Sequence, residues 1–208
     1  YKGKYLLESS FRYDGSSRFA NGLKWGFFPS VSGGWIISDE EILKNDVLTF
    51  LKLRASWGKV GNQNVGFYPF ANTLSQTTYY FNGSARRGVT TGGAPNPLLT
   101  WETKESYNLG LEGSLWNNII EFSIDVFKER TSDILLQLPL PTTFGQPEPV
   151  QNVGIIDNKG WELELRHRKS FKDFSYGVGI QISDATNKVI DMGGVSPRIS
   201  NNTITEEG

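Results

Sequence analysis

Apolar and polar residues alternate one by one along much of the chain. In "LKLRASWGK" (51–59), apolar side chains occupy the odd positions from Leu51 to Trp57 and polar ones the even positions. The same alternation continues in the segments 106–116, 119–127, 161–169 and 174–183. This period of two is typical of β-strands with one apolar and one wet face. Less regular segments near 4–13 and 26–37 bring the expected total to about seven strands.

The connections between these strands are alternately short and long. Compact turns are expected at 38–48, 116–118 and 168–173, and long loops at 60–100, at 131–157 and after 184. Short turns therefore collect at one end of the sheet, as in outer-membrane barrels. The pattern predicts an all-β fold, an antiparallel up-and-down meander of long strands, with Asn117 and Asn118 in a tight hairpin turn. In the first turn, Ser38 and Glu41 have the spacing of a capping box and predict one short helix.

Aromatic residues cluster where the strands are expected to end, and aliphatic residues fill the strand centres. The loop-end set is Trp57, Trp101 and Trp161, and the turn-end set is Trp35, Trp116, Phe174 and Tyr176. Two aromatic belts around an aliphatic band suit the two interfaces of a membrane. Strands of about 10–12 residues are also long enough to cross the membrane when tilted. The alternative is a soluble β-sandwich, a carbohydrate-binding module in which the same apolar parity packs inward.

Charge, cysteine content and hydropathy exclude several classes of protein and of site. The 208 residues carry 21 Lys+Arg against 22 Asp+Glu, which gives a net charge of −1 and no basic footprint for nucleic acid. The absence of cysteine excludes disulfides and Cys-based zinc sites. The sequence also has no apolar run long enough for a transmembrane helix.

Several ordered motifs closely resemble one family. These are "RYDGSSRFA", "WGFFPSVSGGWIISDEE", "LKLRASWGKVGNQN", "NPLLTWETKESYNLGLEGSLWNN", "FSIDVFKERTSDILLQLPLP" and "NVGIIDNKGWELEL". Together they resemble the SusC/RagA family of TonB-linked receptors over about residues 4–190. The resemblance implies a barrel of about 22 strands in the outer membrane of Bacteroidetes-type Gram-negative bacteria. It also implies TonB-energised import of oligosaccharides or peptides with a SusD-like surface lipoprotein.

The chain departs from the full pattern of that family. It begins inside a strand-like segment and contains no plug domain, no TonB-contacting segment and no terminal strand ending in an aromatic residue. We therefore expect residues 1–208 to be a partial receptor barrel domain, with contact to TonB through the absent N-terminal part. Seven strands cannot close a barrel, because single-chain bacterial barrels start at eight.

Catalytic chemistry has little support in this sequence. His167, the single histidine, shares the parity of Trp161 and Leu165 and is expected at the lipid interface. The acids Glu121, Asp125, Glu162 and Glu164 lie on the polar parity and are expected to line a wet lumen. Their expected partners are Arg166 and Arg168, and Lys52 and Arg54 on another strand. We therefore expect no enzyme activity, no cofactor and no metal site.

Substrate binding is a better prediction for the long loops. The 61–100 loop contains "TTYYFNGSARRG", and the 131–157 loop is rich in proline. Aromatic rings beside hydrogen-bond donors suit sugars or peptides. The predicted contacts are Tyr79, Tyr80, Arg86, Arg87 and Phe144. The alternative is that these rings pack against neighbouring loops or contact the lipoprotein.

Overall fold

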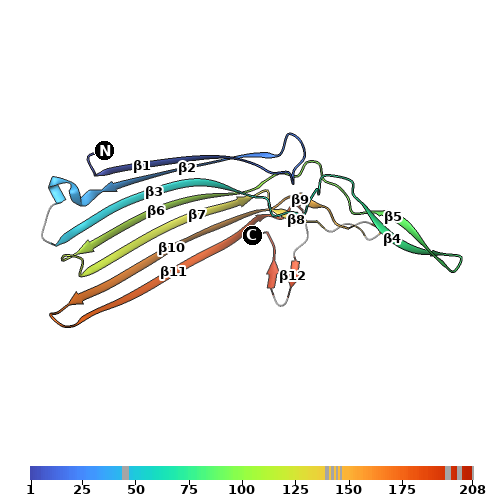
Figure 1. Cartoon of the computed structure of the whole chain (residues 1–208). Helices are drawn as coiled ribbons and strands as arrows, with labels where there is room; N and C mark the ends of the chain where they lie inside the picture. The colour runs from blue at the N-terminus through green and yellow to red at the C-terminus, as the bar shows by residue number, and fades with distance from the viewer. Residues whose placement is uncertain are drawn as a thin grey trace.

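A single antiparallel sheet of seven long strands dominates the chain (Figure 1). The computed structural model describes residues 1–43, 47–138, 141, 143, 145, 147–194, 198–200 and 203–207. The seven strands are β1 (Tyr5–Gly15), β2 (Trp25–Ile36), β3 (Leu48–Asn62), β6 (Glu102–Leu115), β7 (Ile120–Ser132), β10 (Ile155–Ser170) and β11 (Ser175–Asp191).

The order of the strands in the sheet is β1-β2-β3-β6-β7-β10-β11, and every neighbouring pair is antiparallel. The predicted meander is therefore confirmed. Three small hairpins are inserted between or after its strands: β4 (Leu74–Phe81) with β5 (Ser84–Thr91), β8 (Leu135–Gln137) with β9 (Val150–Asn152), and β12 (Arg198–Ser200) with β13 (Thr203–Thr205). The long strands contain 11 to 17 residues and are longer than predicted, because the pairing continues into charged segments that the pattern had assigned to loops.

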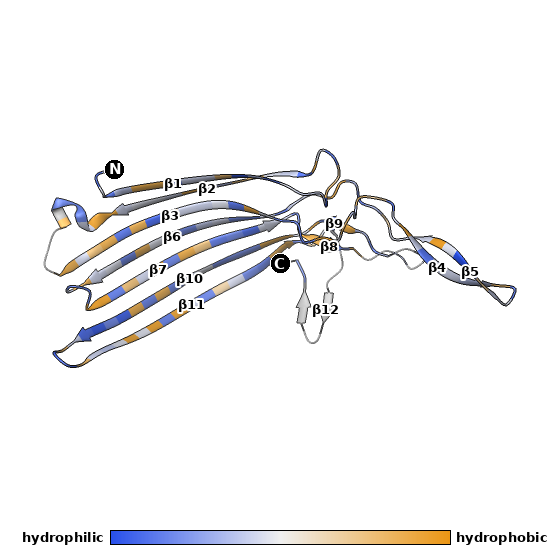
Figure 2. Ribbon diagram, in the orientation of Figure 1, coloured by the Kyte–Doolittle hydropathy of each residue, from blue (hydrophilic) through white to orange (hydrophobic). Residues whose placement is uncertain are grey.

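The two faces of this sheet differ in polarity, as the alternating colours along the strands in Figure 2 show. One register row joins Leu53, Leu111, Ile124, Leu163 and Ile182, and we call this side the apolar face. Leu109, Ile124 and Leu165 on it are 48%, 42% and 43% exposed. No second sheet covers these side chains in the described part of the chain, so the sandwich alternative is wrong. The opposite side, with Arg54 and Asp125, is the polar face.

The turns at the end opposite the long loops are compact. Trp116, Asn117 and Asn118 all have positive φ (51°, 54° and 67°), which confirms the predicted tight turn. The turn after β2 holds two three-residue 3-10 helices, η1 (Ile37–Asp39) and η2 (Glu41–Leu43). The short helix is confirmed, but the capping box is wrong: Ile36 is the N-cap residue of η1, and it makes no side-chain cap hydrogen bond.

A small hydrophobic core lies at the loop end of the sheet, where Phe28 of β2 meets four residues of the loops. It consists of Phe19, Phe28, Val65, Leu99 and Trp101. The ring of Trp101 packs at 5.3 Å from that of Phe19 and 5.2 Å from that of Phe28, and its Nε1 donates to the carbonyl of Lys24 at 3.1 Å. Trp101 therefore does not belong to the loop-end membrane belt in which the sequence had placed it. Its position just before β6 draws it into the loop core.

Among the described residues, no helix has both the length and the apolar character needed to cross a membrane.

Candidate functional site: the polar face and the β4–β5 hairpin

An ion pair crosses the centre of the polar face above a glycine. In the register, Gly110 of β6 lies between Arg54 of β3 and Asp125 of β7. Arg54 Nη2 donates to Asp125 Oδ2 at 2.8 Å, and Ser123 Oγ donates to the same oxygen at 3.0 Å. A Cβ on Gly110 would lie 2.6 Å from Asp125 Oδ1 and 2.8 Å from Arg54 Nε. The missing side chain therefore lets the pair span three strands.

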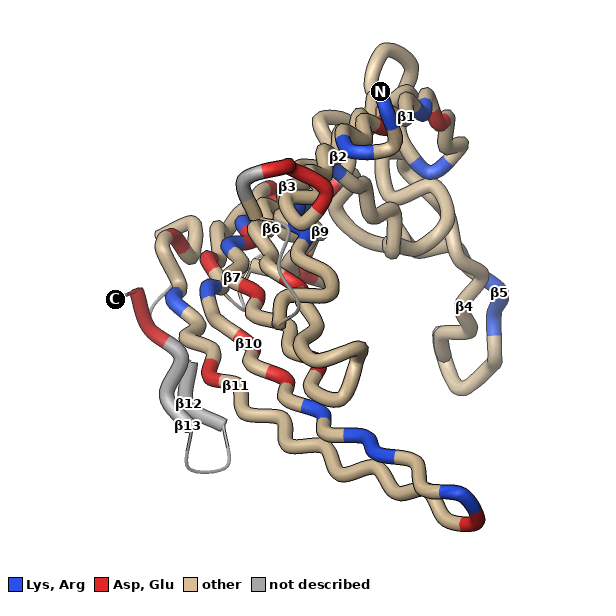
Figure 3. The backbone as a smooth tube through the Cα atoms, turned by 90° about the vertical axis from the view of Figure 1, so that its left-hand side faces the viewer, with Lys and Arg blue, Asp and Glu red and all other residues tan. Residues whose placement is uncertain are grey.

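Further ion pairs line the same face. Lys52 Nζ lies 2.9 Å from Glu112, and Lys104 Nζ lies 2.6 Å from Glu129. At the turn end, Arg168 lies 3.6 Å from Glu121, and Arg166 pairs with Glu164. Charges of both signs thus follow the strands (Figure 3). The carboxylates have basic partners, as the sequence predicted for Glu121, Asp125 and Glu164.

These contacts make a charge-balanced wall. Both partners of the central pair keep some solvent access, with side chains 39% and 14% exposed for Arg54 and Asp125. A wet surface with donors and acceptors at short intervals can contact polar solutes without selecting one sign of charge. Within the described residues, no group of three or more His, Cys, Asp or Glu side chains could hold a metal ion.

Four of the predicted substrate contacts lie on one hairpin. Strands β4 and β5 pair only with each other, and Figure 1 shows them projecting well beyond the end of the large sheet. Every residue of the two strands except Gly88 is exposed, and Tyr80 is 78% exposed. The described structure therefore leaves these rings without a packing partner from another element. Phe144, the fifth predicted contact, lies outside the described residues.

The hairpin divides these four residues between two faces. Tyr79 is directly opposite Arg86, whereas Tyr80 is opposite Ala85 and shares its face with Arg87. The Tyr79 ring also lies across Gly88, because a Cβ there would be 2.6 Å from Cε1 of the ring. Each face therefore presents one tyrosine and one arginine, so the predicted site is two small surfaces back to back.

His167 lies at the turn end of the apolar face, as its parity predicts. Its ring centroid is 5.4 Å from that of Tyr176 on the neighbouring strand. The described contact of His167 is an aromatic packing contact, not a catalytic one.

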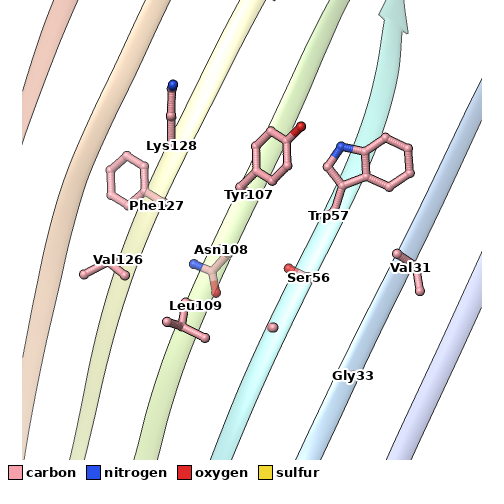
Figure 4. Close-up of a pocket in the computed structure, with 11 residues that line it drawn as sticks. Val31, Gly33, Ser56, Trp57, Tyr107, Asn108, Leu109, Val126, Phe127 and Lys128 are labelled. Atoms are coloured by element: carbon pink, nitrogen blue, oxygen red, sulfur yellow. The ribbon is translucent and has the colours of Figure 1, made fainter.

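One hollow on the apolar face was not predicted from the sequence. It spans β2, β3, β6 and β7. Gly33 and Ala55 are among its lining residues, and Trp57 and Tyr107 lie toward the loop end (Figure 4). Leu109 and Val126 line it, and Lys128 closes it at one corner. Two small residues on the apolar parity, Gly33 of β2 and Ala55 of β3, are register partners. Their small size is the sequence feature that could have indicated a hollow here.

Comparisons with known proteins agree with this geometry. A family model described as "TonB dependent receptor-like, beta-barrel" matches residues 1–205. The chain is 39% identical to TonB-dependent receptor P26 of Formosa agariphila, over 94% of this chain and 20% of that protein. It is 33% identical to TonB-dependent receptor SusC of Bacteroides thetaiotaomicron, over 92% of this chain and 20% of that protein. The chain thus spans about one fifth of the length of these curated relatives.

Solved structures show the same fold. The RagAB peptide importer in its closed-closed state superposes with a TM-score of 0.88 at 28% identity, covering 99% of this chain and 23% of that one. Its open-open state gives a TM-score of 0.85 with the same coverage. The chain therefore belongs to the TonB-dependent receptor β-barrel family and is a barrel segment of the outer membrane.

Proposed function

We propose that this chain is part of the wall of an outer-membrane nutrient importer that is energised through TonB. The observation that carries the proposal is the two-faced sheet. Its exposed aliphatic face suits lipid, and its opposite face is lined by ion pairs such as Arg54–Asp125. Membership of a receptor family supports the same reading. We assign no enzymatic step to the chain.

The cargo we propose is an oligosaccharide or a peptide, taken up together with a SusD-like surface lipoprotein. A solved structure with the same fold, the RagAB peptide importer, supports the peptide class, and the resemblance to the SusC/RagA family implies oligosaccharides as the other class. The β4–β5 hairpin contributes the contacts, because tyrosine rings and guanidinium groups stack on and hydrogen-bond to both classes of cargo. One face of the hairpin carries Tyr79 and Arg86, and the other carries Tyr80 and Arg87.

Uptake by living cells tests this function. A strain lacking the gene that contains this chain is complemented with the full-length protein, and the import of labelled oligosaccharide and peptide pools is measured. We expect import of one pool to return with the gene and to disappear again when TonB is inactivated. Import of neither pool, or import that is independent of TonB, would contradict the proposal.

Paired substitutions then separate the two faces of the hairpin. The variants are Tyr79→Ala with Arg86→Ala on one face and Tyr80→Ala with Arg87→Ala on the other. Because a bound molecule covers one face at a time, we expect one pair to reduce uptake or lipoprotein binding tenfold or more and the other much less. Ser75→Ala with Thr90→Ala, directly opposite each other further down the hairpin, is the control. Equal small effects of all three pairs would remove the hairpin from the binding surface.

A further inference from the structure

Two lysines face each other directly on the apolar face, near its loop end. Lys128 of β7 and Lys159 of β10 are partners in the register, and both side chains are exposed. Among the described residues, neither has an ion pair with a carboxylate. Like charges directly opposite on neighbouring strands repel each other. The arrangement therefore presents two adjacent cations that an anion from outside the described chain can contact together.

The nearest carboxylates on this face are already occupied. Glu105 accepts hydrogen bonds from Trp57 Nε1 at 2.7 Å and from Tyr107 Oη at 2.8 Å. Asp157 accepts two bonds from Arg130, at 2.6 Å from Nε and 2.7 Å from Nη2. Both acids are therefore bonded to other donors, and neither forms an ion pair with Lys128 or Lys159 in the described part of the chain.

The charge balance of this zone is positive. Asp184 lies on the same face of β11, opposite Trp161 and one row nearer the aliphatic band. Against the four acids Glu105, Asp157, Asp184 and Asp191, the last of which is the register partner of Ile155, the same zone holds five cations, namely Lys59, Lys128, Arg130, Lys159 and Lys188. One positive charge therefore remains.

Below the lysines lies the apolar hollow described above. Figure 4 shows Trp57, Tyr107 and Lys128 at its loop-end side, with Val31, Leu109 and Val126 below them. Lys128 extends toward the loop end of its strand in this view. Toward the loop end of the strands, the side chains on this face thus change from aliphatic to aromatic and then to cationic. A lipid runs in the same order, from acyl chain through the interface to a charged headgroup.

We propose that this surface binds an anionic membrane lipid in the leaflet at the long-loop side. The lipid phosphate bridges the ammonium groups of Lys128 and Lys159, and one acyl chain lies in the hollow over Gly33 and Ala55. The phosphate removes the repulsion between the lysines, and the chain fills a trough that the small residues leave open. The inference rests on the membrane position of the sheet and is independent of what the protein imports.

A lipid fits better than a free phosphate ion. The hollow adjoins Lys128 directly, so a molecule with a charged head and an apolar tail contacts both at once. A free anion would use the lysines alone and leave the trough unfilled. The experiment therefore tests the contact with the charged headgroup and the contact with the acyl chain separately.

Binding of dioleoyl phosphatidylglycerol to the full-length protein in detergent, measured by native mass spectrometry, tests the headgroup arm. Dioleoyl phosphatidylcholine is the zwitterionic comparison. We expect the double variant Lys128→Gln/Lys159→Gln to lower the apparent affinity for phosphatidylglycerol about thirtyfold. Its affinity for phosphatidylcholine should stay within about twofold of wild type.

A matched control removes two positive charges at the other end of the strands. Lys169→Gln/Lys172→Gln changes one lysine near the end of β10 and one in the turn to β11, and it should leave phosphatidylglycerol binding unchanged. Thermal stability without anionic lipid gives a second readout that a merely structural role would not produce. There, Lys128→Gln/Lys159→Gln should be as stable as wild type or more stable, because the repulsion is gone. Equal losses of affinity in both double variants would overturn the proposal.

The tail arm uses Ala55→Leu, which fills the trough from an exposed position. We expect weaker binding of phosphatidylglycerol but no change for glycerol phosphate, which has the headgroup without the chains. If glycerol phosphate binds wild type as tightly as the diacyl lipid does, the surface is an anion site and the lipid proposal is wrong.

Discussion

Gly110 shows how one missing side chain organises the polar face. The pair Arg54–Asp125 crosses β6 only because nothing projects from position 110. The alternation in the sequence predicted which face each of these three residues would occupy. It could not predict which acid pairs with which base, because a register spanning 71 residues of chain between Arg54 and Asp125 decides that contact.

Adding a methyl group at this position tests the arrangement. We expect Gly110→Ala to lower the stability of the full-length protein by about 1–3 kcal/mol, since the new Cβ displaces the ion pair. Gly179→Ala is the control, because its Cβ would meet nothing closer than 3.5 Å. Thermal unfolding in detergent measures both.

A double-mutant cycle separates crowding from other causes. In an Asp125→Ala background the carboxylate that the new Cβ would contact is gone together with the ion pair, so the cost of Gly110→Ala should shrink. An unchanged cost in that background would mean that the glycine is required for another reason.

At the scale of elements, the turn after β2 is tied to the first strand by one carboxylate. Glu40 accepts hydrogen bonds from Lys4 Nζ at 3.1 Å, Tyr5 Oη at 2.9 Å and Trp35 Nε1 at 3.2 Å. The bond from Lys4, followed by those from Trp35 and Tyr5, holds the pKa of Glu40 below its usual value. The turn is thus fastened by side chains in place of the predicted capping box.

This fastening should weaken in acid. A carboxyl whose folded-state pKa is lowered stabilises the fold above its unfolded pKa, and the contribution disappears as pH falls through the lowered value. We expect Glu40→Gln to be less stable than wild type at neutral pH, and the difference to vanish as pH falls through the lowered pKa of Glu40. Glu8→Gln on β1 is the matched control. A difference that persists in acid would assign the effect to packing.

The hairpin β4–β5 shows what the hydrophobic pattern misses at this scale. Its strands have no apolar face, so the alternation that identifies the large sheet is absent, and the pattern predicts a loop over this segment. A local signal was present in Asn82-Gly83, which adopts φ values of 49° and 75° in the turn. Turn chemistry, not periodicity, was the evidence that could have placed this element.

At the scale of the whole molecule, the sheet has two unpaired edges, one at β1 and one at β11. Strands β1 and β11 each have one neighbour in this chain, while the five strands between them have two. The meander and the apolar parity could be predicted from the sequence, because both repeat every two residues. The position of Trp101 could not, since its partners Phe19 and Phe28 come from another hairpin more than seventy residues away.

The open edges predict a difference between this chain alone and the full-length protein. Unpaired backbone groups at an edge exchange with water and recruit other strands. In hydrogen exchange of residues 1–208 in detergent, we expect β1 and β11 to exchange at least tenfold faster than β6. In the full-length protein the three strands should be protected alike. Equal protection in the isolated chain would mean that it closes its edges by self-association, which its size in solution would reveal.

The small core at the loop end of the sheet also determines how the projecting hairpin can move. Val65 lies on the segment that leads to β4, and Leu99 and Trp101 lie on the segment that returns from β5. Because both segments are packed into the same cluster, the arm has a fixed base, and bending is confined to the stretch beyond it. A load at the tip therefore passes through Phe28 directly into β2 of the wall. The hairpin is therefore held rigidly at its base and is free only at its tip, so a force on the tip bends it and does not swing it as a whole.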